Sequence, residues 1–123
     1  MILVDASVWI DHVAAPQPQL LSLLTNGDAI SHPFVIGEVA LGHIRNRSVV
    51  LGQLDKIVRA AVASDTEVRE LIERRKLYGK GIGYIDAHLL ASAMLTPGCF
   101  LWTRDRHLRA IADAIGVSAK GYT

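Results

Sequence analysis

The fold is decided by the first eleven residues, Met1-Ile2-Leu3-Val4-Asp5-Ala6-Ser7-Val8-Trp9-Ile10-Asp11. The run from Ile2 to Val4 is short and entirely apolar, which predicts a strand buried on both faces, as in the middle of a parallel sheet. Asp5 then lies at the carboxyl end of that strand, where open α/β sheets bind ligands, and Ser7 begins the following helix. A plain helix N-cap explains Asp5 equally well, so this stretch alone leaves both interpretations open.

Length and composition bound the fold class. The chain has 123 residues, half of them hydrophobic, which predicts one compact domain over residues 1–123 with a substantial core. We expect no secretory signal and no membrane span, and therefore a cytoplasmic location. The single cysteine, Cys99, excludes an internal disulfide and cannot form a thiolate metal site alone; we expect it to be a core residue.

The remaining segments alternate between strand and helix patterns. Helices are predicted over 7–13, around 20–24, from Phe34 to Ile44, over 49–61, 64–77 and 84–94, and after Asp105; strands over 29–31 and 99–103, with a last edge strand near Val117. Ser64-Asp65-Thr66-Glu67 has the form of a capping box. In the helix from Phe34, the apolar side chains expected to face inward are Val35, Val39, Leu41 and Ile44. We predict an α/β class with a central parallel sheet covered by helices.

Three further carboxylates are set in apolar surroundings. Glu38 lies inside an otherwise uncharged helical segment, so it either borders a pocket, is buried at a cost, or points outward from a weak polar face. Asp86 falls in the first turn of a helix that is apolar almost all round, which implies burial. Asp105 repeats the pattern at Asp5, in which a strand is followed by a carboxylate and a helix. Parallel strands bring such positions together at one edge of the sheet.

Four carboxylates in one pocket repel one another, so at neutral pH they hold either protons or cations. Oxygen ligands without His or Cys partners are typical of Mg²⁺ or Mn²⁺ sites. Such ions turn water into a nucleophile and neutralise the charge that develops on a phosphodiester. Thirteen Lys and Arg against the other eight acids would leave +5 on the rest of the chain, which suits a polyanionic substrate.

These residues together resemble the PIN-domain ribonucleases, and specifically the VapC toxins of bacterial type II toxin-antitoxin modules. The matching segments span almost the whole chain: 4–11, 35–38, 83–91 and 103–108. The resemblance implies an acidic quartet of Asp5, Glu38, Asp86 and Asp105 that acts in catalysis and metal binding, with Asp5 and Asp86 the foremost metal ligands. It also implies that Ser7 and Thr103 support the site. Ala6 departs from the hydroxyl-bearing residue, often Thr, that commonly follows the first aspartate.

The same resemblance implies a three-layer α/β/α PIN-like fold, a homodimer, and a VapB-like antitoxin that masks the active site. The implied activity is Mg²⁺- or Mn²⁺-dependent endonucleolytic cleavage of RNA, often tRNA or a ribosomal RNA loop. Arg104 and Arg106 flank Asp105 and are the first basic residues to test for phosphate contact. Arg109 fits either a rim residue or a plain surface charge.

The residues give weaker support to other candidate sites and functions. The basic side chains between Arg69 and Lys80 fit a solvated helix face better than a phosphate rim, and the glycines of 79–83 match neither common phosphate-loop spacing. His88 is expected to be structural. A PIN-type nuclease of RNA processing and a non-catalytic RNA-binding PIN domain are alternatives, although all four acids are present; an aspartyl phosphatase lacks its second aspartate because position 7 is serine.

Overall fold

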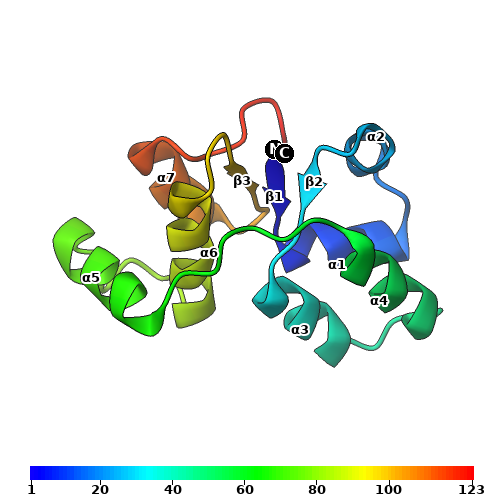
Figure 1. The fold of residues 1–123 in the computed structure, drawn as a ribbon, viewed down its shortest axis with the longest axis horizontal. Coiled ribbons are helices and arrows are strands. Elements are labelled where there is room, and N and C mark those ends of the chain that lie inside the picture. Colours follow the sequence, from blue (N-terminus) through cyan, green and yellow to red (C-terminus); the bar gives the residue numbers. More distant parts are fainter.

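The computed structural model describes all residues 1–123 and contains a short parallel sheet at its centre. The strand formed by the first apolar run lies in the middle, paired in parallel with the other two (Figure 1). Leu3 and Val4 are fully buried, as expected for a strand covered on both faces. The strands are β1 (Ile2–Val4), β2 (Ala29–Ile30) and β3 (Phe100–Trp102), in the order β2-β1-β3.

Single bridges extend the sheet at both edges. Ser31 pairs with Arg59 beyond β2, and Leu101 pairs with Ser118 beyond β3, both in parallel. The expected edge strand near Val117 is therefore present only as one bridge, because the chain turns away after Ala119 donates its N–H to the Leu101 carbonyl. The predicted α/β class with a parallel sheet is confirmed.

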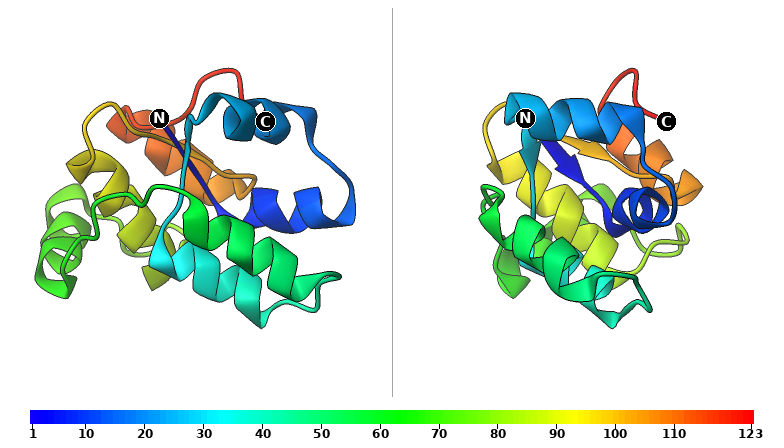
Figure 2. Two further views of the ribbon diagram at one scale, coloured as in Figure 1. Left: turned by 45° about the vertical axis from the view of Figure 1, so that its right-hand side comes forward. Right: turned by 90° about the vertical axis from the view of Figure 1, so that its right-hand side faces the viewer.

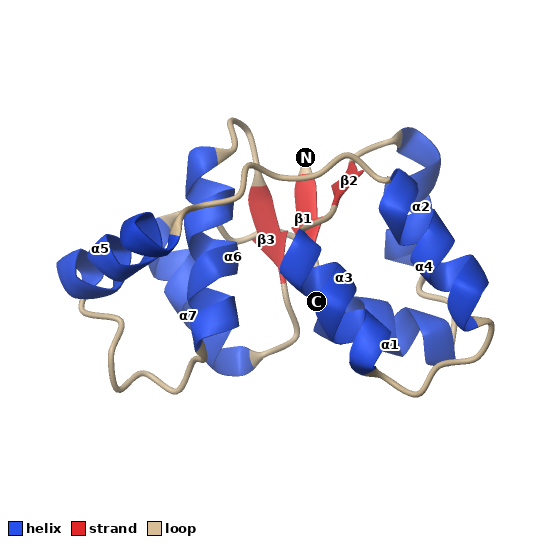
Figure 3. Cartoon of the chain, turned by 60° about the horizontal axis from the view of Figure 1, so that its bottom comes forward, coloured by secondary structure: helices blue, strands red, loops and turns tan.

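Seven helices surround the strands. The last three helices along the chain lie on the β3 side, and the first four lie on the β2 side. The sheet is thus enclosed between two groups of helices (Figure 3). Within the second group, α3 and α4 run side by side (Figure 2). The helices are α1 (Ala6–Ala14), α2 (Pro18–Asn26), α3 (Pro33–Leu41), α4 (Arg47–Lys56), α5 (Asp65–Arg75), α6 (Tyr84–Leu95) and α7 (Arg106–Ile115). No helix is both long enough and apolar enough to cross a membrane.

Local signals set several helix boundaries. The Ser64 hydroxyl accepts the N–H of Glu67, and the Glu67 carboxylate accepts the N–H of Ser64, so the predicted capping box is confirmed. That helix ends at Arg75 and not near Leu77, because Lys76 adopts a left-handed conformation with φ of 54°.

Two predictions about the helical segments were wrong. Leu41 is 90% exposed, since α3 ends at this residue and no other element covers its side chain. The helix predicted over 49–61 runs from Arg47 to Lys56, and the following residues are extended so that the Val58 carbonyl accepts the Ser31 N–H. Pairing with the sheet edge here outweighs the apolar helical periodicity of the segment.

Helix α6 is the most deeply buried helix, with every residue from Ala87 to Ala93 inaccessible to solvent or nearly so. Its small side chains allow close packing against β3 and α5. Helices α1, α6 and α7 all begin at the end of the sheet where β1 and β3 finish (Figure 1). Side chains in the first turns of these helices are therefore brought to one edge of the sheet.

Candidate active site

Asp5 occupies the N-cap position of α1, but its side chain does not cap the helix. Its Oδ2 accepts hydrogen bonds from the hydroxyls of Ser7 and Thr103, each at 2.8 Å. The residue is only 6% exposed, so the carboxylate is buried in a fixed orientation. Of the two interpretations that the sequence left open, the plain N-cap is excluded by these contacts. Because both hydroxyls converge on Oδ2, the second oxygen, Oδ1, is left for another ligand.

The two hydroxyls also connect the ends of β1 and β3. Ser7 Oγ accepts the backbone N–H of Arg104 at 3.1 Å, and Thr103 Oγ1 accepts the backbone N–H of Asp105 at 3.1 Å. Each hydroxyl thus donates to Asp5 and accepts from the segment that follows β3. Ser7 and Thr103 thus orient the Asp5 carboxylate, and the supporting role that the resemblance implied for them stays a prediction.

Asp105 has a different environment from Asp5. It is exposed, and its Oδ1 accepts the N–H of Leu108 at 2.9 Å, which makes it a true N-cap of α7. Its other oxygen remains available. Asp105 therefore combines a local structural role with its position beside the buried site.

Glu38 and Asp86 complete the group from two other helices, α3 and α6. Burial is the main cause that raises the pKa of Glu38, and the carboxylates of Asp5 and Asp86 raise it further. Burial likewise raises the pKa of Asp86; the hydrogen bond from the Gly83 N–H, at 3.1 Å to Oδ2, opposes this, while Asp5 and Asp105 add to it. The raised pKa values indicate that the four carboxylates act on one another electrostatically.

The carboxylates are neighbours without forming a closed ligand shell. No three His, Cys, Asp or Glu side chains are placed to share one metal ion. One oxygen each of Asp5, Asp86 and Asp105 is held by a hydroxyl or backbone donor, so their remaining oxygens are the free ligands. An oxygen-only set with uncompensated like charge fits a hard divalent cation such as Mg²⁺ or Mn²⁺, which binds a few carboxylates and keeps its waters.

The basic residues of this region are mostly engaged in structure. The Arg104 guanidinium pairs with Asp11, donates to Gln17 Oε1 at 2.9 Å and to the Thr123 carbonyl, and lies over the Trp102 ring. This argues against the expected phosphate contact by Arg104, whereas Arg106 is exposed and forms no ion pair.

Arg109 is neither a rim residue nor a plain surface charge. Its Nε and Nη2 donate to the Thr103 carbonyl at 3.3 and 3.0 Å, which fixes the peptide just before Asp105. The sequence did not predict this role, or the pairing of Asp11 with Arg104. Asp11 and Arg104 are 93 residues apart, and no local pattern signals a contact across that distance. A strand-ending hydroxyl followed by Asp and a basic residue four positions later is the available signal for Arg109.

Three histidines make contacts with residues other than the four acids. His88 is 2% exposed and packs edge-on against the rings of Phe34 and Tyr84, which confirms its structural role. His12 accepts the Gln17 N–H on Nδ1, and burial lowers its pKa. The His107 ring packs on Gly81, where a Cβ would come within 3.0 Å of it.

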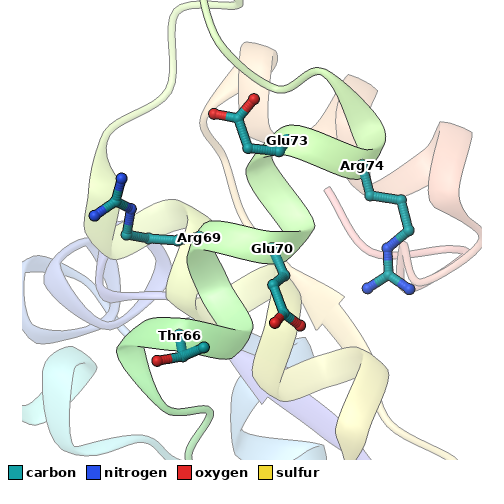
Figure 4. A pocket seen from close by; sticks show the side chains of 5 residues that line it. All are labelled: Thr66, Arg69, Glu70, Glu73 and Arg74. Atoms are coloured by element: carbon teal, nitrogen blue, oxygen red, sulfur yellow. The ribbon is translucent and has the colours of Figure 1, made fainter.

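A hollow of about 670 Å³ lies on the surface away from the four acids. It lies over α5 and is lined by Thr66, Arg69, Glu70, Glu73 and Arg74 (Figure 4). These side chains point away from the helix in different directions, and two arginines and two glutamates share this face. No apolar residue lines the hollow, so it is the solvated helix face that the sequence favoured for these basic residues.

Comparison with known proteins identifies the class. The PIN domain family matches residues 2–114, and the chain belongs to the PIN-domain family. It is 47% identical over 118 residues to Ribonuclease VapC32 of Mycobacterium tuberculosis, in strain CDC 1551 / Oshkosh and equally in strain ATCC 25618 / H37Rv. The alignment covers 96% of this chain and 95% of each relative. The resemblance to VapC-type PIN ribonucleases is thereby confirmed over nearly the full length.

Proposed function

We propose that this chain is a single PIN domain that acts as a metal-dependent endoribonuclease toxin of a type II toxin-antitoxin system. The observation that carries the proposal is the buried Asp5 carboxylate, oriented by two hydroxyls and surrounded by Glu38, Asp86 and Asp105. The relatives named Ribonuclease VapC32 support the ribonuclease activity and the toxin class.

The protein's own residues have distinct tasks in this proposal. Ser7 and Thr103 hold one oxygen of Asp5, and the other oxygen would be free to bind a divalent cation. Asp86 and Asp105 are each oriented by a backbone N–H and present one further oxygen. A bound Mg²⁺ or Mn²⁺ supplies a Lewis acid that activates water and neutralises charge on the scissile phosphate. Glu38 is half-buried and has a raised pKa, so it can accept a proton near the scissile phosphate.

The proposed partners follow from the class. We propose RNA as substrate, with tRNA or a ribosomal RNA loop as the first candidates, a VapB-like antitoxin that covers the active site, and a homodimer. Co-expression with the product of a short reading frame adjoining this gene tests the antitoxin. We expect the two chains to purify together and the RNA cleavage to be suppressed in the complex.

The decisive experiment compares purified wild type and Asp5→Asn on total cellular RNA, with Mg²⁺, with Mn²⁺ and with EDTA, and maps new 5′ ends by sequencing. We expect discrete cuts that require both the metal and Asp5. Asp28→Asn is the matched control, because this exposed aspartate precedes β2 at the opposite end of the sheet and its carbonyl, not its carboxylate, bonds Ile2.

Three results would redirect the assignment. Equal cleavage by Asp5→Asn would show that the active site lies elsewhere. No cleavage by the folded wild type with either metal would favour the alternative of a non-catalytic RNA-binding PIN domain. Cuts confined to precursor RNAs, with no effect of an antitoxin, would favour an RNA-processing nuclease.

A further inference from the structure

A small pocket lies between the first turns of α6 and the loop that precedes it. Its volume is about 200 Å³, and its lining is mostly apolar, with Tyr78, Ile82 and Tyr84 at its walls and Leu77 behind them. Pockets that enclose drug-sized ligands measure roughly 300–1,000 Å³. This one has room for a single planar ring system.

The pocket adjoins the acidic group directly. Gly83 lines it, and the N–H of Gly83 donates to Asp86 Oδ2 at 3.1 Å. One wall of the pocket and the orientation of Asp86 therefore depend on the same peptide. A group bound there contacts the peptide that orients Asp86.

The two tyrosines provide aromatic surface that the core does not use. Tyr78 is 61% exposed and Tyr84 is 47% exposed. Tyr84 is nevertheless fixed, since its hydroxyl donates to Asp65 Oδ1 at 3.1 Å and its ring stands at 90° to that of buried His88, with centroids 4.7 Å apart. A ring that is immobile and half-exposed can stack on a ligand at little cost in conformational entropy.

The charges around the pocket favour an anionic chain as the occupant. Arg75, Lys76 and Lys80 do not line the pocket but flank its lining segment 77–79 in sequence, and all three are exposed without an ion pair. Arg75 and Lys80 line a second groove, which shares Leu77 with the pocket. A neutral aromatic metabolite would gain nothing from this rim, whereas the backbone of RNA would.

We propose that this pocket holds an unpaired nucleobase of the RNA, stacked on Tyr84 and Tyr78, next to the phosphodiester that Asp86 faces. This assignment rests on the proposed ribonuclease function and specifies how the substrate is held. It makes the start of α6 a shared element, in which Asp86 serves the reaction and Tyr84 serves binding.

Binding is measured apart from cleavage in the Asp5→Asn protein with Mg²⁺. The probes are fluorescent single-stranded RNA oligonucleotides of about ten residues, one for each base, and an abasic ribose-phosphate strand of the same length. We expect at least one base-containing strand to bind roughly 5- to 100-fold more tightly than the abasic strand, since each stacked base contributes about 1–3 kcal/mol. Adding Tyr84→Ala should abolish this preference.

Two further variants separate stacking from folding. Tyr84→Phe keeps the ring and loses only the bond to Asp65, so it should retain the preference. Phe100→Ala removes a 42% exposed ring at the start of β3, at the far end of the sheet, and should also retain it. The proposal is overturned if Asp5→Asn binds base-containing and abasic strands equally. It is also overturned if the preference for base-containing strands persists after Tyr84→Ala is added.

Failure of the nucleobase pocket and failure of the proposed ribonuclease function give different results. Cleavage by the wild type without base-dependent binding would refute the nucleobase pocket alone. Base-dependent binding that needs Tyr84, in a protein that cleaves no RNA, would refute the nuclease and support the pocket.

Discussion

Asp5 and Asp105 stand at the carboxyl ends of neighbouring strands, β1 and β3, and each is followed at once by a helix. Asp5 is buried, and both of its hydrogen bonds come from side-chain hydroxyls, one of them 98 residues away in sequence. Asp105 is exposed, and its hydrogen bond comes from its own helix. Tertiary structure therefore orients the first carboxylate, and local helix geometry orients the second.

Asp5 and Asp105 occupy similar positions but differ in what they contribute to function and to stability. A buried carboxylate that does not cap its helix contributes little to local stability and is repelled by its neighbours. An exposed carboxylate that caps its helix stabilises that helix directly. We expect substitutions at Asp5 to affect mainly activity and substitutions at Asp105 to affect both.

The largest effect expected is on cleavage by Asp5→Asn. Losing this charge removes several kcal/mol of charge stabilisation, so the cleavage rate should fall by roughly 10³-fold. Asp105→Asn keeps the cap and one ligand oxygen, and its rate should fall by only about 10- to 100-fold. Initial rates on one mapped RNA substrate with saturating Mg²⁺ measure both. Equal losses at the two positions would contradict the distinction drawn between them.

Thr103 connects the two aspartates, because its hydroxyl donates to Asp5 and accepts from the Asp105 N–H. Thr103→Val preserves shape but removes one of the two hydrogen bonds to Asp5 Oδ2 and the acceptor of the Asp105 N–H, at a residue that is itself 2% exposed. We expect a loss of about 1–3 kcal/mol in the free energy of unfolding and about 10- to 100-fold in cleavage rate. Thr103→Ser, which restores the hydroxyl, should recover most of both in urea denaturation and in rate assays.

Asp86→Asn should lower activity yet raise metal-free stability near pH 7. The folded-state pKa of Asp86 is raised, so its contribution to stability is present below the ordinary carboxyl pKa and is lost as pH rises through the folded value. The wild type should therefore gain stability as pH falls from 7 toward the ordinary carboxyl range, and Asp86→Asn should gain less.

Thermal melting with and without Mg²⁺ checks this repulsion. Mg²⁺ should raise the midpoint of the wild type near pH 7, and the increase should shrink at lower pH, where the carboxylates hold protons. Asp28→Asn, at the far end of the sheet, should melt like the wild type under every condition. A midpoint of the wild type that is indifferent to Mg²⁺ would contradict metal binding by this group.

The parts of the fold that the sequence predicted correctly depend on local or periodic signals. The apolar run before Asp5 predicted the central strand, and Ser64 with Glu67 predicted the start of α5. Leu41 was misplaced because apolar periodicity assumes that a partner covers each apolar position, and α3 ends there. Which residue covers a given side chain is a property of the tertiary structure.

The site residues also divide into those that local sequence signals predict and those that only the tertiary structure places. The positions of Asp5, Asp86 and Asp105 at strand ends and helix starts could be predicted, because parallel topology brings those ends together. Glu38 lies inside α3, and only its uncharged surroundings in the sequence marked it. The guanidinium of Arg104 could not be placed, since its partner Asp11 lies 93 residues earlier and the pair forms only when β1 and β3 are adjacent. The catalytic and metal-binding roles of Asp5, Glu38, Asp86 and Asp105 stay predictions.

The smallest effect expected is the loss of the α7 cap in Asp105→Ala. Removing an N-cap carboxylate costs about 1 kcal/mol, because the N–H of Leu108 loses its acceptor. Asp105→Ser restores an acceptor without the charge, so it should recover stability while cleavage stays reduced. Asp5→Asn removes no cap, and relief of repulsion should leave its urea midpoint equal to or above that of the wild type. A fall in the urea midpoint of Asp5→Asn as large as that of Asp105→Ala would contradict this expectation. It would mean that the two hydroxyl hydrogen bonds of Asp5 stabilise the fold more than repulsion from the neighbouring acids destabilises it. Asp5 and Asp105 would then differ in burial alone.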